Sequence, residues 1–310
     1  MQKSSIKIVF FGSFEFAVPT LMALKNEGYD IVAVITNPDK PSGRKKILTP
    51  PPIKVAAQKL GLLILQPEKL RDNPNLVEQL KYLPNAKRST LNASLGIVVG
   101  YGKLIPPEIF NLPAHGTLTI HPSLLPKYRG PSPVQTAMLN GDNDTGVTII
   151  EIDEELDHGD ILAAESHKLS PTATYEEAHN ALFNLGADLL IKTLPDYLTD
   201  KIQPQPQDHS QATFTRKFTT EDGEIKQTET AQQAYNKIRA LNPEPGAYIW
   251  LEKNPLRLNL RERTIRLKIL EAELRDGRLE FKKVQLEGGK PITFKEFHAN
   301  HPQFRNNLLQ

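Results

Sequence analysis

A histidine and an aspartate stand at positions suited to acid–base chemistry. His121 closes the apolar run 117–120 and is followed at once by a polar loop braced with prolines, 122–130. Asp157 belongs to the stretch 151–160, where seven of ten side chains are ionisable. If both side chains point into one cleft, the carboxylate can stabilise the imidazolium form of the histidine. The pattern suggests an acid–base pair, but a lone histidine is more often structural, so both interpretations stay open at this point.

Other kinds of catalytic site are poorly supported by the sequence. The chain has no cysteine, which excludes a disulfide framework, a thiolate metal site and a cysteine nucleophile. His121, Asp157 and His158 lack the spacing of common histidine metal motifs, so no metal site is predicted. The G-x-S-x-G motif of serine hydrolases is absent, and the turn at 11–19 lacks the G-x-G-x-x-G of dinucleotide-binding folds.

A basic segment, 37–54, follows the second predicted strand. Its five cations are Lys40, Arg44, Lys45, Lys46 and Lys54. Several prolines and Gly43 argue against a helix or a central strand, so we expect a mobile loop. Ligands of open α/β sheets bind beyond the carboxyl ends of the strands, which favours contact with phosphate. A charged loop that is merely solvated is the alternative.

Strand-like and helix-like patterns alternate over the first 200 residues. Strands are expected over 8–11, 31–35, 62–65, 97–99, 117–120, 147–152 and 161–164, and helices over 19–26, 55–60, 70–82, 133–140 and 175–194. Continuous apolar runs separated by helices are typical of buried parallel strands. The pattern therefore predicts an α/β fold with a mostly parallel sheet.

The chain changes character after a segment rich in proline and glutamine, 201–211. From residue 213 onward we count 18 Lys and Arg against 13 Asp and Glu, a net charge of +5, which leaves −3 for the first 212 residues. A helix is expected over 227–240, and short strands over 246–251, 264–272 and 279–285 indicate a small barrel. We therefore expect domains at 1–203 and 213–310, joined by a linker at 204–212.

Composition suggests a soluble chain. The formal net charge is only +2, and the apolar runs are far shorter than the roughly 18 residues that cross a bilayer. The first residues lack the apolar segment of a secretory signal. We expect a cytoplasmic protein without a membrane partner.

The motifs together resemble a known enzyme family. H-P-S-L-L-P-K-Y-R-G, followed by G-D-N-D-T-G-V-T-I and L-D-H-G-D-I-L, is similar to the 10-formyltetrahydrofolate-dependent formyltransferases. The turn F-E-F-A-V-P, the basic segment and V-V-G-Y-G-K-L-I-P narrow the resemblance to the branch that formylates methionyl initiator tRNA. R-A-L-N-P-E-P-G-A-Y and L-E-G-G-K-P-I-T-F-K-E-F extend it over nearly the whole chain.

The resemblance implies a Rossmann-like formyltransferase fold with a C-terminal OB-like domain that contacts tRNA. It implies transfer of a formyl group from 10-formyltetrahydrofolate to the α-amino group of methionyl initiator tRNA, without a metal; no protein partner can be inferred. His121 matches the catalytic histidine and Asp157 the catalytic aspartate. The folate-binding positions matched are Ser123, Leu124, Leu125 and Pro126, with Gly100, Tyr101, Gly102, Leu104 and Ile105 along the pterin pocket, and the tRNA-binding positions are Arg44, Lys45 and Lys46.

One departure from the family pattern affects the predicted chemistry. Thr119 stands where the family has an asparagine, whose amide would donate a hydrogen bond to the formyl oxygen. A threonine hydroxyl can also donate, but losing such a donor typically costs about 2.7–4 kcal/mol of barrier. A weakened or inactive descendant that binds folate or RNA is therefore one alternative. A related sugar-nucleotide formyltransferase, or a hydrolase of the same folate, is another, although neither needs the basic segment. The polar segment 81–92 is longer than the resemblance implies.

Overall fold

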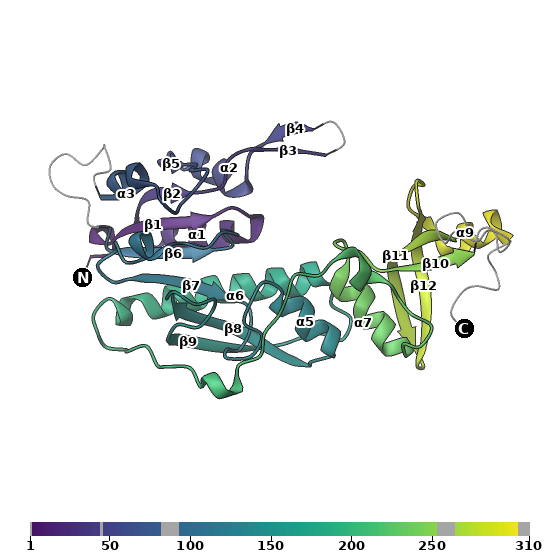
Figure 1. Cartoon of the computed structure of the whole chain (residues 1–310). Coiled ribbons are helices and arrows are strands. Elements are labelled where there is room, and N and C mark those ends of the chain that lie inside the picture. The colour runs from purple at the N-terminus through teal and green to yellow at the C-terminus, as the bar shows by residue number, and fades with distance from the viewer. Residues whose placement is uncertain (1, 44–45, 82–92, 253–263, 303–310) are drawn as a thin grey trace. The chain divides into compact units, whose positions relative to one another are not determined.

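The computed structural model describes residues 2–43, 46–81, 93–252 and 264–302. The chain forms two compact units, which are described separately (Figure 1). Unit 1 comprises Met1–Gly130, Thr145–His167 and Asn180–Phe214, and unit 2 comprises Pro131–Asp144, Lys168–His179 and Thr215–Gln310. The domain limits expected at residues 203 and 213 stay a prediction.

A seven-stranded, mostly parallel sheet forms the centre of the α/β fold. Its strand order is β5-β2-β1-β6-β7-β8-β9. The strands are β1 (Lys7–Gly12), β2 (Asp30–Ile35), β5 (Ile64–Leu65), β6 (Leu95–Val99), β7 (Thr117–His121), β8 (Asp144–Glu151) and β9 (Ile161–Lys168). The pairs from β5 to β7 are parallel, and β8 runs antiparallel to β7. The mostly parallel sheet predicted from the continuous apolar runs is confirmed.

Helices alternate with these strands along the chain, as the sequence pattern predicted. They are α1 (Val18–Asn26), α2 (Pro52–Lys59), α3 (Pro74–Lys81), α5 (Pro133–Asn140) and α6 (Tyr175–Tyr197), together with the short α4 (Pro107–Phe110), which was not predicted. Helix α5 and residues 175–179 of α6 belong to unit 2. The helix expected from residue 70 begins only at Pro74. The reason is local: the Asn73 side chain accepts a hydrogen bond from the Leu76 amide at 3.1 Å, which caps the helix, and Pro74 suits its first position.

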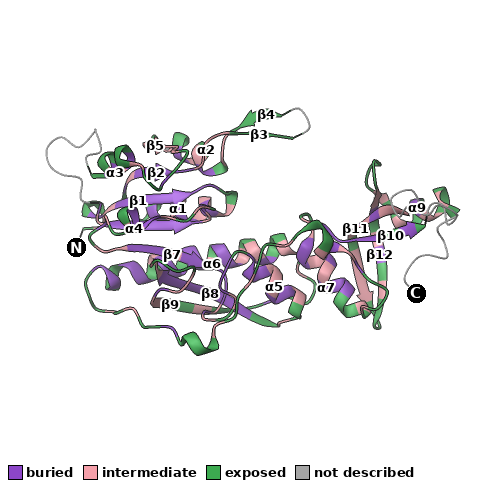
Figure 2. Cartoon of the chain, viewed as in Figure 1, coloured by how far each residue is buried: buried purple, intermediate pink, exposed green. Residues whose placement is uncertain are grey.

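The core of the sheet explains why the apolar runs become its strands. β1 and β6 are buried along almost their whole length (Figure 2). Ile8 and Phe10 are fully buried, and Val9 and Phe11 pack in a cluster with Ile35 and other apolar side chains. Because successive side chains point to opposite faces, burial of all of them requires both faces of the sheet to be covered.

The basic segment is a hairpin rather than a loop without secondary structure. β3 (Lys40–Ser42) and β4 (Ile47–Thr49) pair antiparallel in a sheet of their own, with every residue of both strands exposed. The prediction that this segment holds no central strand is correct, but its last residues, 52–54, already belong to α2, so the prediction that it holds no helix is wrong there. The pairing was missed because isolated three-residue strands give no hydrophobic alternation.

Unit 2 contains a C-terminal antiparallel sheet where the sequence predicted the short strands of a small barrel. Its order is β10 (Tyr248–Glu252), β11 (Thr264–Arg275), β12 (Arg278–Leu286) and β13 (Ile292–Thr293). Helices α7 (Ala231–Leu241) and α9 (Phe294–Asn300) pack on these strands through a core that includes Ile238, Leu267 and Phe297. The helix α9 was not predicted; the Thr293 and Glu296 side chains cap its start reciprocally.

Within the described residues, no helix combines the length and the apolar character that a transmembrane span requires.

Candidate active site

The predicted histidine and aspartate meet in unit 1. His121 is the last residue of β7 and is 5% exposed. Its Nδ1 lies 3.5 Å from Asp157 Oδ1, and its Nε2 lies 2.9 Å from the carbonyl oxygen of Tyr128. A carbonyl can only accept, so Nε2 carries the hydrogen of that bond. Both ring nitrogens thus face acceptors, and a doubly protonated ring can donate at both positions.

Asp157 is held by its backbone as well as its side chain. It adopts a φ of 52°, a left-handed conformation that aspartate tolerates better than most residues. Its Oδ2 accepts a hydrogen bond from the Gly130 amide at 2.7 Å. Gly159 completes the turn, where a Cβ atom would lie 2.0 Å from the Glu151 carbonyl oxygen, so only glycine fits. The turn therefore aims one carboxylate oxygen at His121 and the other at Gly130.

The loop after His121 is fixed by hydrogen bonds to its own backbone and to β8. Ser123 is fully buried, and its hydroxyl donates to the Lys127 carbonyl at 2.7 Å. Thr148 of β8 donates to the Ser123 carbonyl at 2.7 Å and accepts from the Leu125 amide at 3.1 Å. Leu125 is 8% exposed, whereas Leu124 and Pro126 are partly exposed. The loop is thus rigidly placed; folate binding by its residues stays a prediction.

Thr119 shares a face of β7 with His121, since side chains two apart on a strand point the same way. Its hydroxyl donates to the Val98 carbonyl on β6 at 2.9 Å. A hydroxyl has one hydrogen to donate, and here it goes to the backbone. The prediction that Thr119 is a second donor to substrate requires this bond to break.

The residues expected along the pterin pocket differ in exposure. Gly100 and Gly102 have φ values of 53° and 78°, and a Cβ atom on Gly100 would lie 2.1 Å from the Phe16 ring. Tyr101 is 1% exposed, packs edge-on against a phenylalanine of β1, and burial raises its pKa to about 12. Leu104 is 79% exposed and Ile105 packs at the edge of the core cluster. Only the exposed part of this segment is available to a ligand without rearrangement.

Of the predicted tRNA-binding cations, the structure describes Lys46, which directly precedes β4. Lys46 is exposed there with a φ of 48°, while Arg44 and Lys45 lie outside the described residues. Lys54, counted with them in the sequence, lies in α2 and contacts both carboxylate oxygens of Asp39 at 2.8 Å. One of the five cations is therefore neutralised by a partner.

Two polar residues at the site were missed by the sequence analysis. Arg129 and Gln207 are 3% and 5% exposed and are hydrogen-bonded to each other. Gln207 lies in the segment expected to be a linker, which gives no periodic pattern. One signal was available in the sequence: Arg129 belongs to the predicted catalytic loop. If its guanidinium is buried there, it needs hydrogen-bond acceptors from elsewhere in the chain, and Gln207 is one of them.

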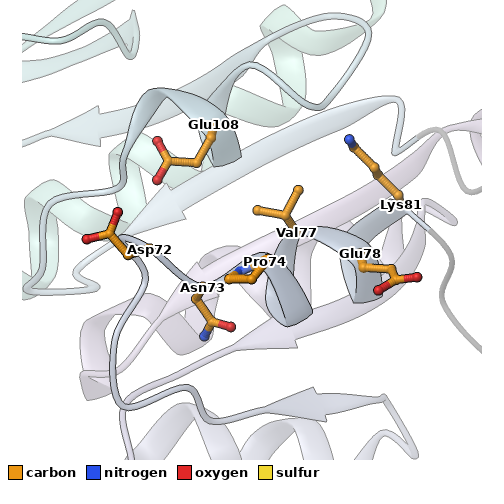
Figure 3. Close-up of a pocket in the computed structure, with 7 residues that line it drawn as sticks. All are labelled: Asp72, Asn73, Pro74, Val77, Glu78, Lys81 and Glu108. Atoms are coloured by element: carbon orange, nitrogen blue, oxygen red, sulfur yellow. The ribbon is translucent and has the colours of Figure 1, made fainter.

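A surface pocket lies elsewhere in unit 1, on the helices α3 and α4 (Figure 3). It is lined by Asp72, Asn73, Pro74, Val77, Glu78, Lys81 and Glu108. None of these is a predicted site residue, and the lining shows no acid–base pair. Across the described part of the chain, no cluster of three or more His, Asp or Glu side chains could hold a metal ion.

Comparison with known proteins defines the class of protein to which this fold and site belong. The formyl transferase family model matches residues 6–194, and the model of the formyl transferase C-terminal domain matches residues 217–302. The chain belongs to the formyl transferase family.

Its relatives narrow the class further. A methionyl-tRNA formyltransferase of Chloroflexus aurantiacus is 46% identical over 253 residues, which cover 82% of this chain and 79% of that protein. At this similarity and coverage the chain is a member of the methionyl-tRNA formyltransferases, so the resemblance seen in the sequence motifs is confirmed.

Solved structures support the fold. A methionyl-tRNA formyltransferase from Clostridium thermocellum is similar with a TM-score of 0.57 and 20% identity, covering 91% of this chain and 98% of that one. An N-formyltransferase of Helicobacter canadensis, solved with folinic acid and dTDP-3-aminofucose, has a TM-score of 0.65 and 18% identity over 93% and 98% of the two chains. At these identities the likeness shows the fold alone.

Proposed function

We propose that this formyltransferase moves a formyl group from 10-formyltetrahydrofolate to the α-amino group of methionyl initiator tRNA. The observation that carries the proposal is the 3.5 Å contact between His121 Nδ1 and Asp157 Oδ1 in a buried site at the carboxyl end of β7. The family match supports the formyl-transfer chemistry, and the similarity to methionyl-tRNA formyltransferases supports the acceptor. Because that acceptor serves translation, we place the reaction in the cytoplasm.

The roles of the pair follow from the charges that develop. The amine nitrogen attacks the formyl carbon, and the carbonyl oxygen becomes negative in a tetrahedral intermediate. The positive charge of protonated His121 stabilises that oxygen, and the Asp157 carboxylate holds this charge on the ring. A direct hydrogen bond to the oxygen requires Nε2 to leave the Tyr128 carbonyl. Collapse breaks the bond to the folate nitrogen, which takes up a proton while the attacking nitrogen loses one. A water held at Asp157 can relay this proton.

Binding of the donor and of tRNA involves separate parts of the chain in this proposal. The loop residues Ser123–Pro126, fixed by Thr148, and the exposed part of 100–106 contact the folate. Lys46 and its neighbours in the hairpin contact tRNA phosphates, and the cations of residues 213–310 add to the attraction. Binding through phosphate contacts weakens steeply with salt.

The direct test is a formyl-transfer assay with labelled methionyl initiator tRNA and 10-formyltetrahydrofolate. We expect transfer by the natural chain and its loss in His121→Ala and Asp157→Ala, with circular dichroism showing that both variants keep the fold. Full activity in either variant would refute its assigned role. Transfer to a sugar nucleotide but not to tRNA would refute the proposed acceptor.

The Thr119 contact favours one further candidate, an enzyme of reduced activity. The Thr119 hydroxyl, which would replace the amide of the family's asparagine, already donates its hydrogen to the Val98 carbonyl. A filter-binding assay beside the turnover assay separates this case, because an inactive descendant binds tRNA or folate without transferring the formyl group.

A further inference from the structure

The side chain of Gln207 uses both ends of its amide in buried hydrogen bonds. Its Oε1 accepts from Arg129 Nε at 3.1 Å and from Arg129 Nη2 at 2.6 Å. Its Nε2 donates to the carbonyl oxygens of Asp157 at 3.0 Å and of Gly159 at 2.7 Å. Each amide atom thus makes two bonds, which is its full capacity.

These bonds join the two segments that build the candidate site. Arg129 lies between Tyr128, whose carbonyl faces His121 Nε2, and Gly130, whose amide holds Asp157 Oδ2. At the other end of the amide, Gln207 Nε2 donates hydrogen bonds to the turn that carries Asp157. Beside the bond from Gly130 to Asp157, the Gln207 side chain therefore makes a second connection between the loop that orients the imidazole and the turn that orients the carboxylate.

The turn needs such support from its surroundings. Asp157 has a left-handed φ of 52°, a conformation that costs free energy for any residue with a Cβ atom. Its carbonyl oxygen and that of Gly159 both point to Gln207 Nε2 rather than to solvent. Removing the two donors leaves a buried acceptor at Gly159 and a partly buried one at Asp157 without this partner, and the Gly130 bond to the Asp157 side chain then holds the turn with less support.

The segment around Gln207 is itself anchored on both sides. The backbones of Gln205 and Ile161 exchange two hydrogen bonds of 2.8 Å, and the Arg129 amide donates to the Thr213 carbonyl at 2.8 Å. Arg129 Nη2 also contacts His209 Nδ1 at 2.8 Å. The segment that looks like a linker in the sequence therefore serves as a fixed support behind the site.

We infer that Gln207 is a positioning residue for the reaction, which keeps the Asp157 carboxylate in reach of His121 by holding the 157–159 turn. The inference rests on the proposed function, because its kinetic test measures formyl transfer to methionyl initiator tRNA. Gln207 does not touch the reacting atoms; it acts through the backbone of Asp157.

The substitution Gln207→Glu separates this role from a general packing role. The two residues have nearly the same shape, and a carboxylate accepts from Arg129 at least as well as an amide does. It has no hydrogen to give the two carbonyls, and its negative oxygen repels theirs, so the hydrogen bonds to the turn are lost while those from Arg129 stay. Gln205→Glu is the matched control, since it makes the same change two residues away on an exposed side chain.

Steady-state kinetics of the full chain with methionyl initiator tRNA provide the first readout. For Gln207→Glu we expect kcat to fall by about 10- to 100-fold with KM for both substrates little changed, because misplacement of a catalytic group by about 1 Å has effects of this size. Gln205→Glu should match the natural chain. An unchanged kcat in Gln207→Glu, or a loss confined to KM, would overturn the inference.

A double-mutant cycle tests whether the effect passes through Asp157. In the Asp157→Asn background, Gln207→Glu should cost little further activity, because the group it positions is already disabled. A full additive loss there would show a role independent of Asp157 and contradict the inference. Should Gln207→Glu fail to fold, Gln207→Met, which is neutral and of similar length, removes the donors to the turn together with the acceptor for Arg129; the same fall in kcat and the same non-additivity with Asp157→Asn are expected of it.

Hydrogen exchange at the Gly130 amide gives a readout independent of activity. That amide donates to Asp157 Oδ2, so a loosened turn should speed its exchange in Gln207→Glu relative to Gln205→Glu. Equal exchange in both variants would overturn the inference. If the natural chain transfers no formyl group to methionyl tRNA, the proposed function fails, while this measurement still decides the positioning role.

Discussion

Thr119 is the residue at which this chain departs most clearly from the pattern expected at its active site. Sequence alone suggested a shorter donor in place of an amide. The structure adds that the threonine hydrogen is donated to the Val98 carbonyl at 2.9 Å. A hydrogen already bonded to the backbone stabilises an oxyanion only after the side chain rotates, which weakens its contribution in the transition state.

We therefore expect Thr119→Asn to raise kcat by about tenfold or more, since one donor to an oxyanion is typically worth about 10²–10³ in rate. Single-turnover formyl transfer measures the change. Thr119→Val is the control of equal shape: if the hydroxyl serves only Val98, kcat changes little. An unchanged or lower kcat in the asparagine variant, or a large loss in the valine variant, would count against this account.

Gly159 provides a test of the turn geometry at the level of one atom. A Cβ atom there would lie 2.0 Å from the Glu151 carbonyl oxygen, so Gly159→Ala must displace the turn that carries Asp157. We expect a loss of about 2–4 kcal/mol in the free energy of unfolding and a strongly reduced kcat.

The control for this variant is Gly28→Ala. Its φ is +85°, but a Cβ atom would meet nothing within 4 Å, so it carries only the left-handed penalty of about 1–2 kcal/mol. Both variants should lose stability in urea denaturation, whereas only Gly159→Ala should lose activity. Normal kcat in Gly159→Ala would show that the turn can move without displacing the carboxylate.

At the scale of elements, the β3–β4 hairpin is the feature best suited to phosphate contact. Its strands are exposed on all residues, and Lys46 extends from the turn between them, whereas Lys54 is neutralised by Asp39. Gln66 also donates to Asp39 Oδ1, so the base of the hairpin is held by hydrogen bonds while Lys40 and Lys46 remain exposed.

We expect Lys46→Ala to weaken tRNA binding and to reduce the slope of log affinity against log salt by about 1. Filter binding over a range of salt concentrations measures that slope, and kcat at saturating tRNA should be unchanged. Lys59→Ala, which removes an equal charge from the exposed end of α2, is the control and should leave the slope unaltered. Equal slopes in both variants would argue against a role of the hairpin in tRNA contact.

At the scale of the whole molecule, we expect stability in acid to depend on His179, a histidine outside the catalytic pair. Burial at the start of α6 lowers the pKa of His179 from 6.5 to about 4. Between these values the unfolded chain binds a proton that the folded chain does not. The free energy of unfolding therefore decreases as pH falls from 6.5 to about 4, by about 3 kcal/mol at most.

His179→Gln, which does not titrate in this range, should flatten that dependence. Urea unfolding of both proteins at pH 7 and pH 4.5 gives the difference directly. The glutamine variant loses the ring contact with Tyr175, at 5.0 Å between centroids, so its stability at pH 7 should be lower; the change with pH is the readout. The same loss of stability on acidification in both proteins would contradict the assignment to His179.

The sequence by itself determined the family, most strands of the large sheet and most of the longer helices. Hydrophobic periodicity, prolines at helix starts and apolar runs are contiguous patterns, so β1, β6, β7, α5 and α6 could be located from them. His121 could be placed at a strand end for the same reason. The contiguous motifs around it carried the resemblance that the relatives confirm.

The tertiary structure alone decided how the site is held. Gln207 and Arg129 are 78 residues apart, and Gln207 reaches the Asp157 carbonyl across 50 residues. Likewise, that the Thr119 hydroxyl is donated to Val98 depends on the register of β6 against β7. Such bonds form between groups that only packing brings together, and an isolated glutamine in a proline-rich segment has no local pattern to reveal its partners. Contiguous patterns reveal local conformation, whereas partner choice across the chain depends on the folded core.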